Sequence, residues 1–385
     1  MSEEKIDVTK EVTEPVSQKK TRQKLFHITK RVDATLGFKA VVRAISVLTA
    51  LVVCAFVLLM FKPGKFGIFF SESFNAFAGS STKFLNTLYE FAVLLGITVA
   101  ILPCFKMKFW NLGAEGQVLI GGLAAALISK YVGPSVPNAI CVMLMIIAAM
   151  VSSAIWSLIP AFFKAKFNTN ETLFTLMMNY IAMGLIVYFA FVVNPSHGTF
   201  AGLTNGVFDF ESSVWYSLIP FFIVVVMTGF IFVYLNFTKQ GYELSVVGEA
   251  RNTAKYVGIN VNGVIIRTAI FSGLLCGLIG YFVVSKQTSI EQNVLGGRGF
   301  TAVMIAWLGH MNVLEILLMA FLVAFITRGS AQVATRVDLG TAFTKITIAT
   351  FLIVILAFEF FLNYEVHINR DWFKPKFKKI EEDNQ

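Results

Sequence analysis

Long apolar runs separated by short polar stretches set the pattern of this chain. Residues 44–62 read AISVLTALVVCAFVLLMFK, and residues 214–236 read VWYSLIPFFIVVVMTGFIFVYLN. Each run is long enough to cross a hydrocarbon core as a helix, which needs roughly 20 apolar residues. A membrane barrel would instead show alternating strands of about ten residues. The pattern therefore predicts an all-α polytopic membrane protein.

About ten transmembrane helices are expected. The run 299–328 is divided into two spans because Gly309, His310 and Asn312 interrupt it. The approximate bounds are 44–62, 84–103, 111–130, 136–163, 171–193, 214–236, 263–285, 299–310, 313–328 and 344–363.

Basic residues predict the orientation of these spans and three regions of the chain. An N-terminal tail (1–43) and a C-terminal tail (364–385) are both basic and flank a transmembrane domain (44–363). Lys and Arg concentrate on the cytoplasmic side of membrane proteins, so both termini are expected to be cytoplasmic. Two termini on one side require an even number of spans, which agrees with ten.

The loops between spans mostly agree with this orientation. Loops 164–170 and 237–262 fall inside, and loop 194–213, which has no Lys or Arg, falls outside. Lys62, Lys65 and Lys83 also fall outside and count against the scheme.

Composition supports the class and narrows the chemistry. The chain is 56% hydrophobic and 14% charged, with a mean hydropathy of +0.71, whereas soluble domains carry about 25% charged residues. The net charge of +9 lies in tails and short loops, so no nucleic-acid partner is expected. The four cysteines (Cys54, Cys104, Cys141 and Cys276) have no metal-ligand spacing and are interpreted as packing residues. Neither a metal site nor a catalytic site is predicted.

Two similar helix starts suggest an internal repeat. Asn111 begins Asn-Leu-Gly-Ala-Glu-Gly and Asn293 begins Asn-Val-Leu-Gly-Gly-Arg-Gly, five spans further on. An odd number of spans per half inverts the second half in the membrane. Transporters often use such repeats, with glycine-interrupted helices lining the substrate site. Two inverted five-helix halves are therefore expected, the alternative being two unrelated glycine-rich helix starts.

Polar side chains within spans are the candidates for the substrate pathway, because they are costly in a membrane. Asn111 and Glu115 share a helical face, and so do Glu171, Thr175 and Asn179. Glu115 near a helix start also suits the helix dipole, and it could instead brace the broken helix against a neighbouring backbone. A capping Asn170 followed by Glu171 is also an ordinary helix start.

The loop 237–262 predicts a docking surface. Val247, Ala250, Ala254 and Val257 recur at helical spacing, which indicates a short amphipathic helix between Gly248 and Gly258. The alternative is a solvated interfacial helix without a partner. The predicted docking residues are Val247, Gly248, Glu249, Ala250, Arg251, Asn252, Ala254, Tyr256 and Gly258.

Four stretches resemble a known family. QGYELSVVGEARNTAKYVGINV resembles the ATPase-docking loop of ABC-type uptake permeases for branched-chain amino acids, ribose and nucleosides. NLGAEGQVLIGG resembles the signature of the nucleoside branch, where sugar relatives carry a motif of the GIDLSVG kind. FNTNETLFTLMMNYIA and NVLGGRGFTAVMIAWLGHMNVL follow that branch in order and spacing. The resemblance covers about residues 40–365, and it departs from the family at Val313, where proline is common.

The resemblance implies a bacterial plasma-membrane permease subunit that imports nucleosides by alternating access. Its implied partners are a cytoplasmic ABC ATPase, a second related permease or a second copy, and an extracellular substrate-binding lipoprotein. The pathway residues Asn111, Glu115, Asn179 and Asn293 would then hydrogen-bond to ribose hydroxyls or base edges. A sugar permease for ribose or galactose and an ion-coupled carrier titrating Glu115 or Glu171 are the alternatives.

The sequence lacks the phosphate-binding motif of an ATPase, which bears on the energy source for transport. No GxxxxGK[ST] phosphate loop occurs in the chain, so no ATP hydrolysis by the chain itself is expected. The energy must therefore come from a partner or an ion gradient. The resemblance implies that a partner ATPase uses ATP and Mg²⁺ and that this chain binds no cofactor.

Overall fold

The computed structural model describes residues 26–30, 36–194, 200–201, 203, 214–287 and 289–368. The chain divides into a membrane unit, residues 43–356, and a terminal unit, which joins residues 1–42 to residues 357–385. The helices of the described part are α1 (Leu36–Phe61), α2 (Phe66–Ala78), α3 (Ser81–Lys106), α4 (Ala114–Tyr131), α5 (Asn138–Phe167), α6 (Glu171–Val193), α7 (Trp215–Phe237), α8 (Lys239–Glu249), α9 (Arg251–Tyr256), α10 (Val261–Gln287), α11 (Arg298–Leu308), α12 (Val313–Val337) and α13 (Thr341–Asn363), with a short 3₁₀ turn at Gly133–Ser135.

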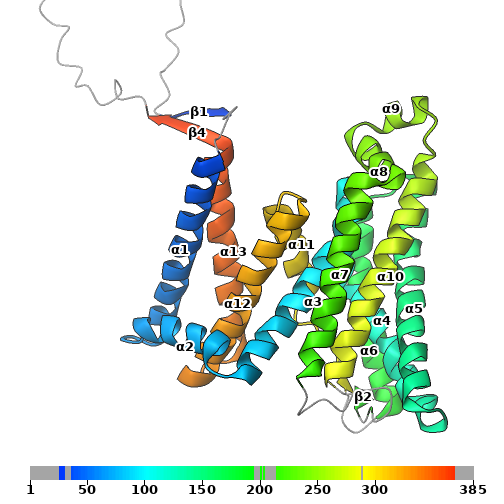
Figure 1. Ribbon diagram of the computed structural model, residues 1–385, viewed down its shortest axis with the longest axis horizontal. Coiled ribbons are helices and arrows are strands. Elements are labelled where there is room, and N and C mark those ends of the chain that lie inside the picture. The colour runs from blue at the N-terminus through cyan, green and yellow to red at the C-terminus, as the bar shows by residue number, and fades with distance from the viewer. Residues whose placement is uncertain are drawn as a thin grey trace, which may run out of the picture. The chain divides into compact units, whose positions relative to one another are not determined.

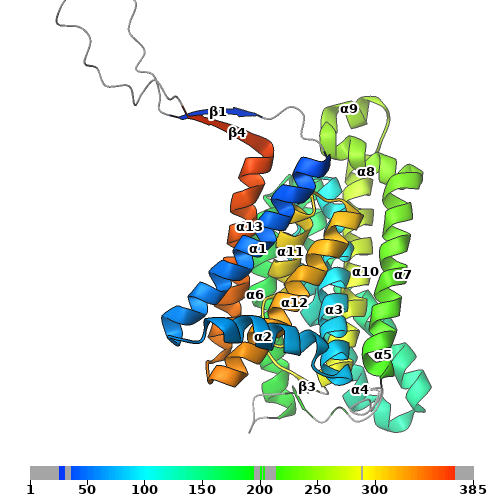
Figure 2. The ribbon, with the colours of Figure 1, turned by 60° about the vertical axis from the view of Figure 1, so that its left-hand side comes forward.

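Each of the ten predicted spans corresponds to a helix (Figure 1). Eight of the described helices are long and apolar enough to cross a membrane, namely α1, α3, α5, α6, α7, α10, α12 and α13. The other two, α4 and α11, are shorter or more polar. The protein is a polytopic all-α membrane protein, as predicted. The sequence interpretation missed α2, which lies across the end of α12 (Figure 2).

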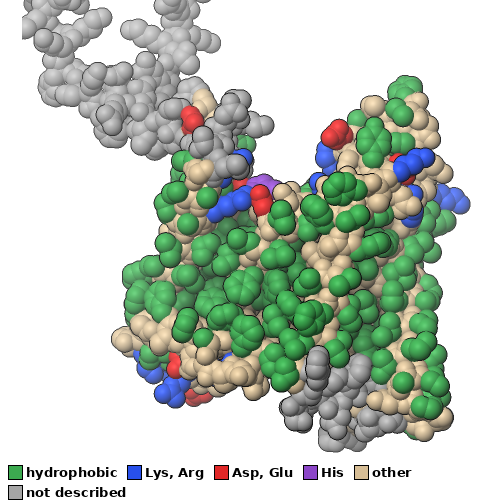
Figure 3. All heavy atoms as spheres, viewed as in Figure 1, with side chains coloured by type: hydrophobic (Ala, Val, Ile, Leu, Met, Phe, Trp, Pro, Cys, Tyr) green, Lys and Arg blue, Asp and Glu red, His purple; other side chains and the backbone are tan. Residues whose placement is uncertain are grey.

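Two helices form the centre of the membrane unit. The most apolar stretch of α3 is 94% buried and that of α10 is 72% buried, whereas the other spans are half buried or less. On the face seen in Figure 3, apolar side chains cover the bundle between its charged ends. Such an inside-out distribution fits a bundle whose outer helices face lipid and whose central helices do not.

The GxxxG motif of α10 packs against α5. A methyl group added to Gly273 would lie 2.7 Å from the Ala154 Cα, and one added to Gly277 would clash with the backbone of Ala149. Ser157 Oγ also donates to the Ala269 carbonyl at 2.6 Å across the same contact. Small residues therefore allow the two antiparallel backbones to approach closely.

Several loops gather at one end of the membrane unit. Gly248 of α8 packs against the Lys106 carbonyl at the end of α3. The Trp110 and Trp307 rings, 5.3 Å apart, bring the α11–α12 turn to the same end. Because α5 runs antiparallel to α10, the loop 164–170 lies there too.

At the opposite end, the strand β2 (Phe200–Ala201) pairs with β3 (Ser289–Ile290). The loops predicted to be inside thus share one end, and the described part of loop 194–213 lies at the other. Which end faces the cytoplasm stays a prediction.

The split of the run 299–328 is confirmed. α11 ends at Leu308 and α12 begins at Val313. Between them His310 and Met311 adopt left-handed backbone angles, with φ of 49° and 57°, and Asn312 caps α12 by accepting from the Leu314 N–H at 3.2 Å. His310 lies in the turn, as predicted, where its ring contacts Glu315 at 2.9 Å.

The terminal unit contains a feature that the basic-tail prediction missed. The strands β1 (Phe26–Lys30) and β4 (Tyr364–Ile368) form an antiparallel pair with His27 opposite His367. Most of the tail lysines and arginines, and most of loop 194–213, lie outside the described residues.

Candidate functional site

The start of α4 is a broken approach to a membrane helix. Residues 107–113 are not helical, and α4 begins at Ala114. The Asn111 side-chain oxygen accepts from the Gly113 N–H at 3.0 Å and from Gln117 Nε2 at 3.3 Å. Asn111 is 1% exposed, so its amide stabilises the turn internally. We call residues 107–117 the α4 start.

The polar stripe of α6 fastens the α4 start. Thr175 Oγ1 accepts from the Leu112 N–H at 3.1 Å. Asn179 accepts from the Gly116 N–H and donates to the Leu112 carbonyl, both at 2.8 Å. These side chains replace the backbone partners that a broken helix lacks, because hydrocarbon offers no water for them. The two predicted polar stripes therefore meet each other.

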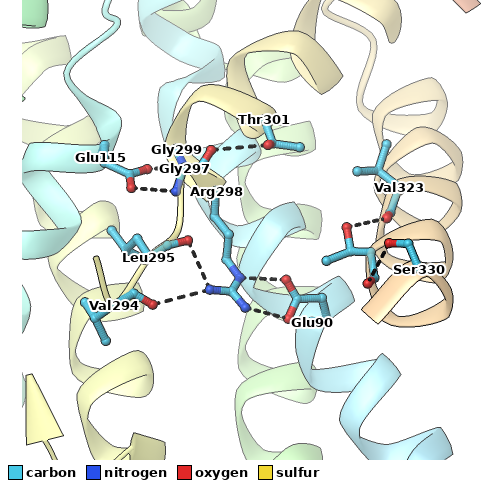
Figure 4. A network of polar contacts seen from close by, with 11 residues as sticks. Glu90, Glu115, Val294, Leu295, Gly297, Arg298, Gly299, Thr301, Val323 and Ser330 are labelled. Carbon is cyan, nitrogen blue, oxygen red and sulfur yellow. Dashed lines mark hydrogen bonds and ion pairs between the residues drawn. The ribbon is translucent and has the colours of Figure 1, made fainter. Parts of the chain in front are cut away.

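Glu115 connects the two broken helices (Figure 4). Its carboxylate accepts from the Gly297 N–H at 3.0 Å and from the Gly299 N–H at 2.6 Å. The donors are the N-cap residue Gly297 and the first turn of α11, where free N–H groups and the helix dipole favour an anion. A side chain on Gly299 would collide with the Glu115 backbone, so this position requires glycine.

A second carboxylate holds the same turn from the other side. Glu90 of α3 is 2% exposed and binds Arg298 through two contacts, of 2.6 Å from Nε and 2.9 Å from Nη2. The remaining Arg298 nitrogen donates to the Leu295 carbonyl at 3.0 Å. Gly296 and Gly297 adopt φ of 61° and 91°, which favour glycine. We call residues 291–299 the α11 start; two carboxylates and one guanidinium stabilise it.

A cavity of about 290 Å³ lies beside the α11 start. It lies between α3, the α11 start, α12 and α13, all within the membrane unit. Four threonines and one asparagine supply hydroxyl and amide groups to its wall. These residues are Asn293, Thr301, Thr327, Thr341 and Thr344.

The charged wall of the cavity is mostly basic. Glu90 and Arg298 neutralise each other, which leaves Arg328 of α12 and Lys345 of α13. Neither makes a hydrogen bond or ion pair in the part of the chain that the structure describes. Arg328 is half-buried within a candidate span, which is an expensive place for a charge. It is therefore a functional candidate.

The predicted pathway residues occupy three different settings. Four of them lie together and are buried, namely Asn111, Glu115, Thr175 and Asn179. Their polar atoms hydrogen-bond mainly to backbone groups. Glu171 forms an ion pair with Lys164 at 2.7 Å, near the end that carries α8. Asn293 is exposed and lines the cavity. The geometry favours the bracing alternative for Glu115, and its contact with substrate stays a prediction.

Sequence reasoning missed three important residues of the site, namely Glu90, Arg298 and Arg328. Glu90 was not singled out, because a carboxylate near a span end is usually interfacial, but it is buried against Arg298. Arg328 was placed at the end of span 313–328, whereas α12 continues to Val337 and carries Arg328 inside the bundle. A single basic residue in a long apolar run was the signal that could have revealed it.

The predicted docking loop folds as two helices. α8 ends at Glu249 and α9 begins at Arg251, because Ala250 is extended, with φ of −150° and ψ of 103°. The expected single helix after Gly248 is therefore wrong in its extent. Gly248 lies inside α8, where contact with α3 requires its small size.

The two helices carry the predicted docking residues on two faces. Val247 and Ala254 are buried under the helices, and the exposed residues are Glu249, Ala250, Asn252, Tyr256 and Gly258. Tyr256 is 91% exposed and lies beside Val257, which is 68% exposed. Arg251 is partly buried.

The fold and the site together define a class, namely a helical membrane transport subunit in which two broken helices meet beside a polar cavity. A family model described as the permease component of branched-chain amino acid transport systems matches residues 83–357. The chain belongs to this family of ABC transporter permeases, which are transport subunits and not enzymes.

Three of the similar proteins are permeases named for glucose, for guanosine and for nucleosides. A glucose ABC transporter permease from Haloferax volcanii is 27% identical over 85% of this chain and 90% of its own length. A guanosine permease from Bacillus subtilis is 26% identical over 68% of this chain and 77% of its own length. A nucleoside permease from Lactococcus lactis is 24% identical over 68% of this chain and 76% of its own length. No solved structure matches the chain.

Proposed function

We propose that this chain is the membrane-spanning permease subunit of an ATP-driven importer for nucleosides. The polar cavity at the meeting point of two broken helices carries the proposal, because it offers hydrogen bonds inside an apolar bundle. The guanosine and nucleoside relatives support the substrate. The two relatives from Bacillus subtilis, both guanosine permeases, support pairing with a second related permease.

Substrate enters from an extracellular binding lipoprotein and leaves to the cytoplasm. The cavity lies in the half of the membrane unit opposite α8, since Glu90 is in the first half of α3 and Arg328 in the second half of α12. With α8 and both termini on the cytoplasmic side of a bacterial plasma membrane, the cavity faces outward. The substrate pathway then passes Asn293, and Glu115 positions the α11 start beside it.

The partner ATPase, which uses ATP and Mg²⁺, docks on α8 and α9. Tyr242, Tyr256 and Val257 expose large apolar side chains there, at 65%, 91% and 68%. A groove of about 470 Å³ lies next to them, between Tyr242, Val257 and Arg267. Exposed aromatic residues beside a groove are typical anchors of a protein interface. Closing the ATPase dimer would pull on this loop and rock the bundle.

Docking is tested by replacing Tyr256. Tyr256→Asp should abolish co-purification of the ATPase with the tagged permease while leaving permease abundance unchanged. Tyr131→Asp is the matched control, because Tyr131 is 63% exposed at the far end of α4. Equal ATPase recovery from both variants would contradict docking at this position.

Uptake tests the substrate. Cells with and without the chain are given labelled uridine and guanosine, with excess ribose or glucose as competitors. Loss of nucleoside uptake on deletion, unaffected by the sugars, supports the proposal. Unchanged nucleoside uptake together with lost sugar uptake would contradict it.

Sugar import is the second candidate. The glucose relative matches the largest share of this chain among the three compared above. The cavity wall presents hydroxyl, amide and charged groups beside aliphatic side chains, with no aromatic ring among its lining residues. An ion-coupled carrier has no comparable support, because the relatives compared are ABC permeases.

A further inference from the structure

The cavity differs from a site built to hold a nucleobase. Bases stack on aromatic side chains in sites that bind them without strict sequence preference, and each stack contributes roughly 1–3 kcal/mol. The lining residues of this cavity include no Phe, Tyr, Trp or His. Its volume of about 290 Å³ also lies at the lower limit of small-molecule pockets, which is roughly 300 Å³. The wall suits a small, hydroxylated ring better than a planar base.

The wall presents acceptors on two sides. Thr301 Oγ1 donates to the Gly297 carbonyl at 3.2 Å, and Thr327 Oγ1 donates to the Val323 carbonyl at 2.8 Å. With their protons directed at backbone carbonyls, both oxygens present lone pairs as acceptors (Figure 4 shows Thr301). A substrate hydroxyl can therefore donate to either one.

Arg328 supplies the matching donors. It makes no hydrogen bond or ion pair among the described residues, and Glu90 attracts it only at longer range. A guanidinium offers five N–H donors in a planar fork, which suits two neighbouring oxygen atoms. Arg298 cannot take this role, because Glu90 and two carbonyls occupy its nitrogens.

We propose that the cavity binds the sugar part of the substrate, with Arg328 donating to vicinal hydroxyls and the base left unrecognised. This inference rests on the proposed function. It is compatible with the substrates for which the glucose and guanosine relatives are named. Arg328 is then the residue that determines specificity for hydroxyl-bearing rings.

Ligand-induced stabilisation tests the proposal without the binding protein. The purified complex of permease and ATPase is heated with uridine, D-ribose or uracil at equal millimolar concentration, and the unfolding midpoint is measured. A ligand that binds only the folded state raises that midpoint. Uridine and ribose should raise it, and uracil should not. Arg328→Gln should remove the rise, with affinity for uridine falling about tenfold or more, as expected for lost charged hydrogen bonds.

Arg336→Gln is the matched control, because Arg336 lies further along the same helix with a 71% exposed side chain. It should retain the ligand response, and Arg328→Lys should retain part of it. Stabilisation by uracil equal to that by uridine would overturn the proposal, and so would a full response in Arg328→Gln or none in the wild-type complex. A response to ribose but not to uridine would instead overturn nucleoside import and leave the sugar-binding cavity standing.

Discussion

The α4 start and the α11 start both place polar backbone groups inside an apolar bundle, but different side chains stabilise them. Both are asparagine- and glycine-containing approaches to a helix that begins inside the bundle. The α4 start is satisfied by neutral groups, mainly Thr175 and Asn179 of α6. The α11 start is held by two carboxylates and a guanidinium, and it borders the cavity.

The difference indicates which side of the site can move. Buried neutral hydrogen bonds at the α4 start are costly to break, because no water replaces them in the hydrocarbon core. Charged groups beside a polar cavity can exchange partners with water or substrate at lower cost. We therefore expect the α11 start to shift during transport while the α4 start stays fixed to α6.

The largest effect is expected at Arg298. Arg298→Ala leaves the buried Glu90 carboxylate without its bidentate partner, and such a loss costs about 3 kcal/mol or more. The unfolding midpoint of the purified complex should fall sharply. The double variant Glu90→Leu with Arg298→Leu should be less damaging, because it removes both charges. If the double variant is the less stable of the two, the pair is not the main support of the α11 start.

Glu115→Gln should have the next largest effect. An amide keeps one acceptor oxygen but turns its NH₂ toward an N–H donor, so about 2 kcal/mol of stability should be lost. Transport by the remaining folded molecules should also change, since the α11 start is displaced. Glu291→Gln is the control, because Glu291 is an exposed carboxylate on the same segment. Reduced transport with unchanged stability would instead support the predicted contact of Glu115 with substrate.

Asn179→Ala tests the α4 start. It removes two hydrogen bonds and leaves the Gly116 N–H and the Leu112 carbonyl without these partners, at a cost of about 1–2 kcal/mol. Thermal unfolding should show this loss, while the uptake rate per folded molecule stays at the wild-type value. A selective loss of uptake would show that the α4 start takes part in the movement after all.

Thr175→Val should have the smallest effect of the series. Its shape is nearly conserved. The acceptor for the Leu112 N–H is lost, together with the hydrogen bond that Oγ1 donates to the Glu171 carbonyl, so destabilisation of about 1 kcal/mol is expected. Combined with Asn179→Ala, the two effects should not add, because both side chains hold Leu112. Strict additivity in a double-mutant cycle would mean that the two contacts act separately.

Apolar patterning alone determined the architecture of this protein. A hydrocarbon core demands about 20 apolar residues per helix, so the runs along the chain located all ten spans. Asn312 and the left-handed turn before it were likewise visible as a break in an apolar run.

The sequence also selected polar residues that belong together, but not what they contact. Asn111, Thr175 and Asn179 were chosen because polar groups are costly in a membrane, and the structure places their side chains against the backbone of the α4 start. A single sequence has no means of showing that the partner of a carboxylate lies about 180 residues away, as for Glu115 and Gly297.

Tertiary structure alone decided the cavity and its charges. Glu90, Arg298 and Arg328 lie on three different elements, and their distances depend on how α3, the α11 start and α12 pack. Charge neutralisation, unlike hydrophobic burial, depends on the position of a specific partner and is invisible in a local pattern. Hydrophobicity therefore determined which segments enter the membrane, whereas packing decided which charge is neutralised and which remains available to a ligand.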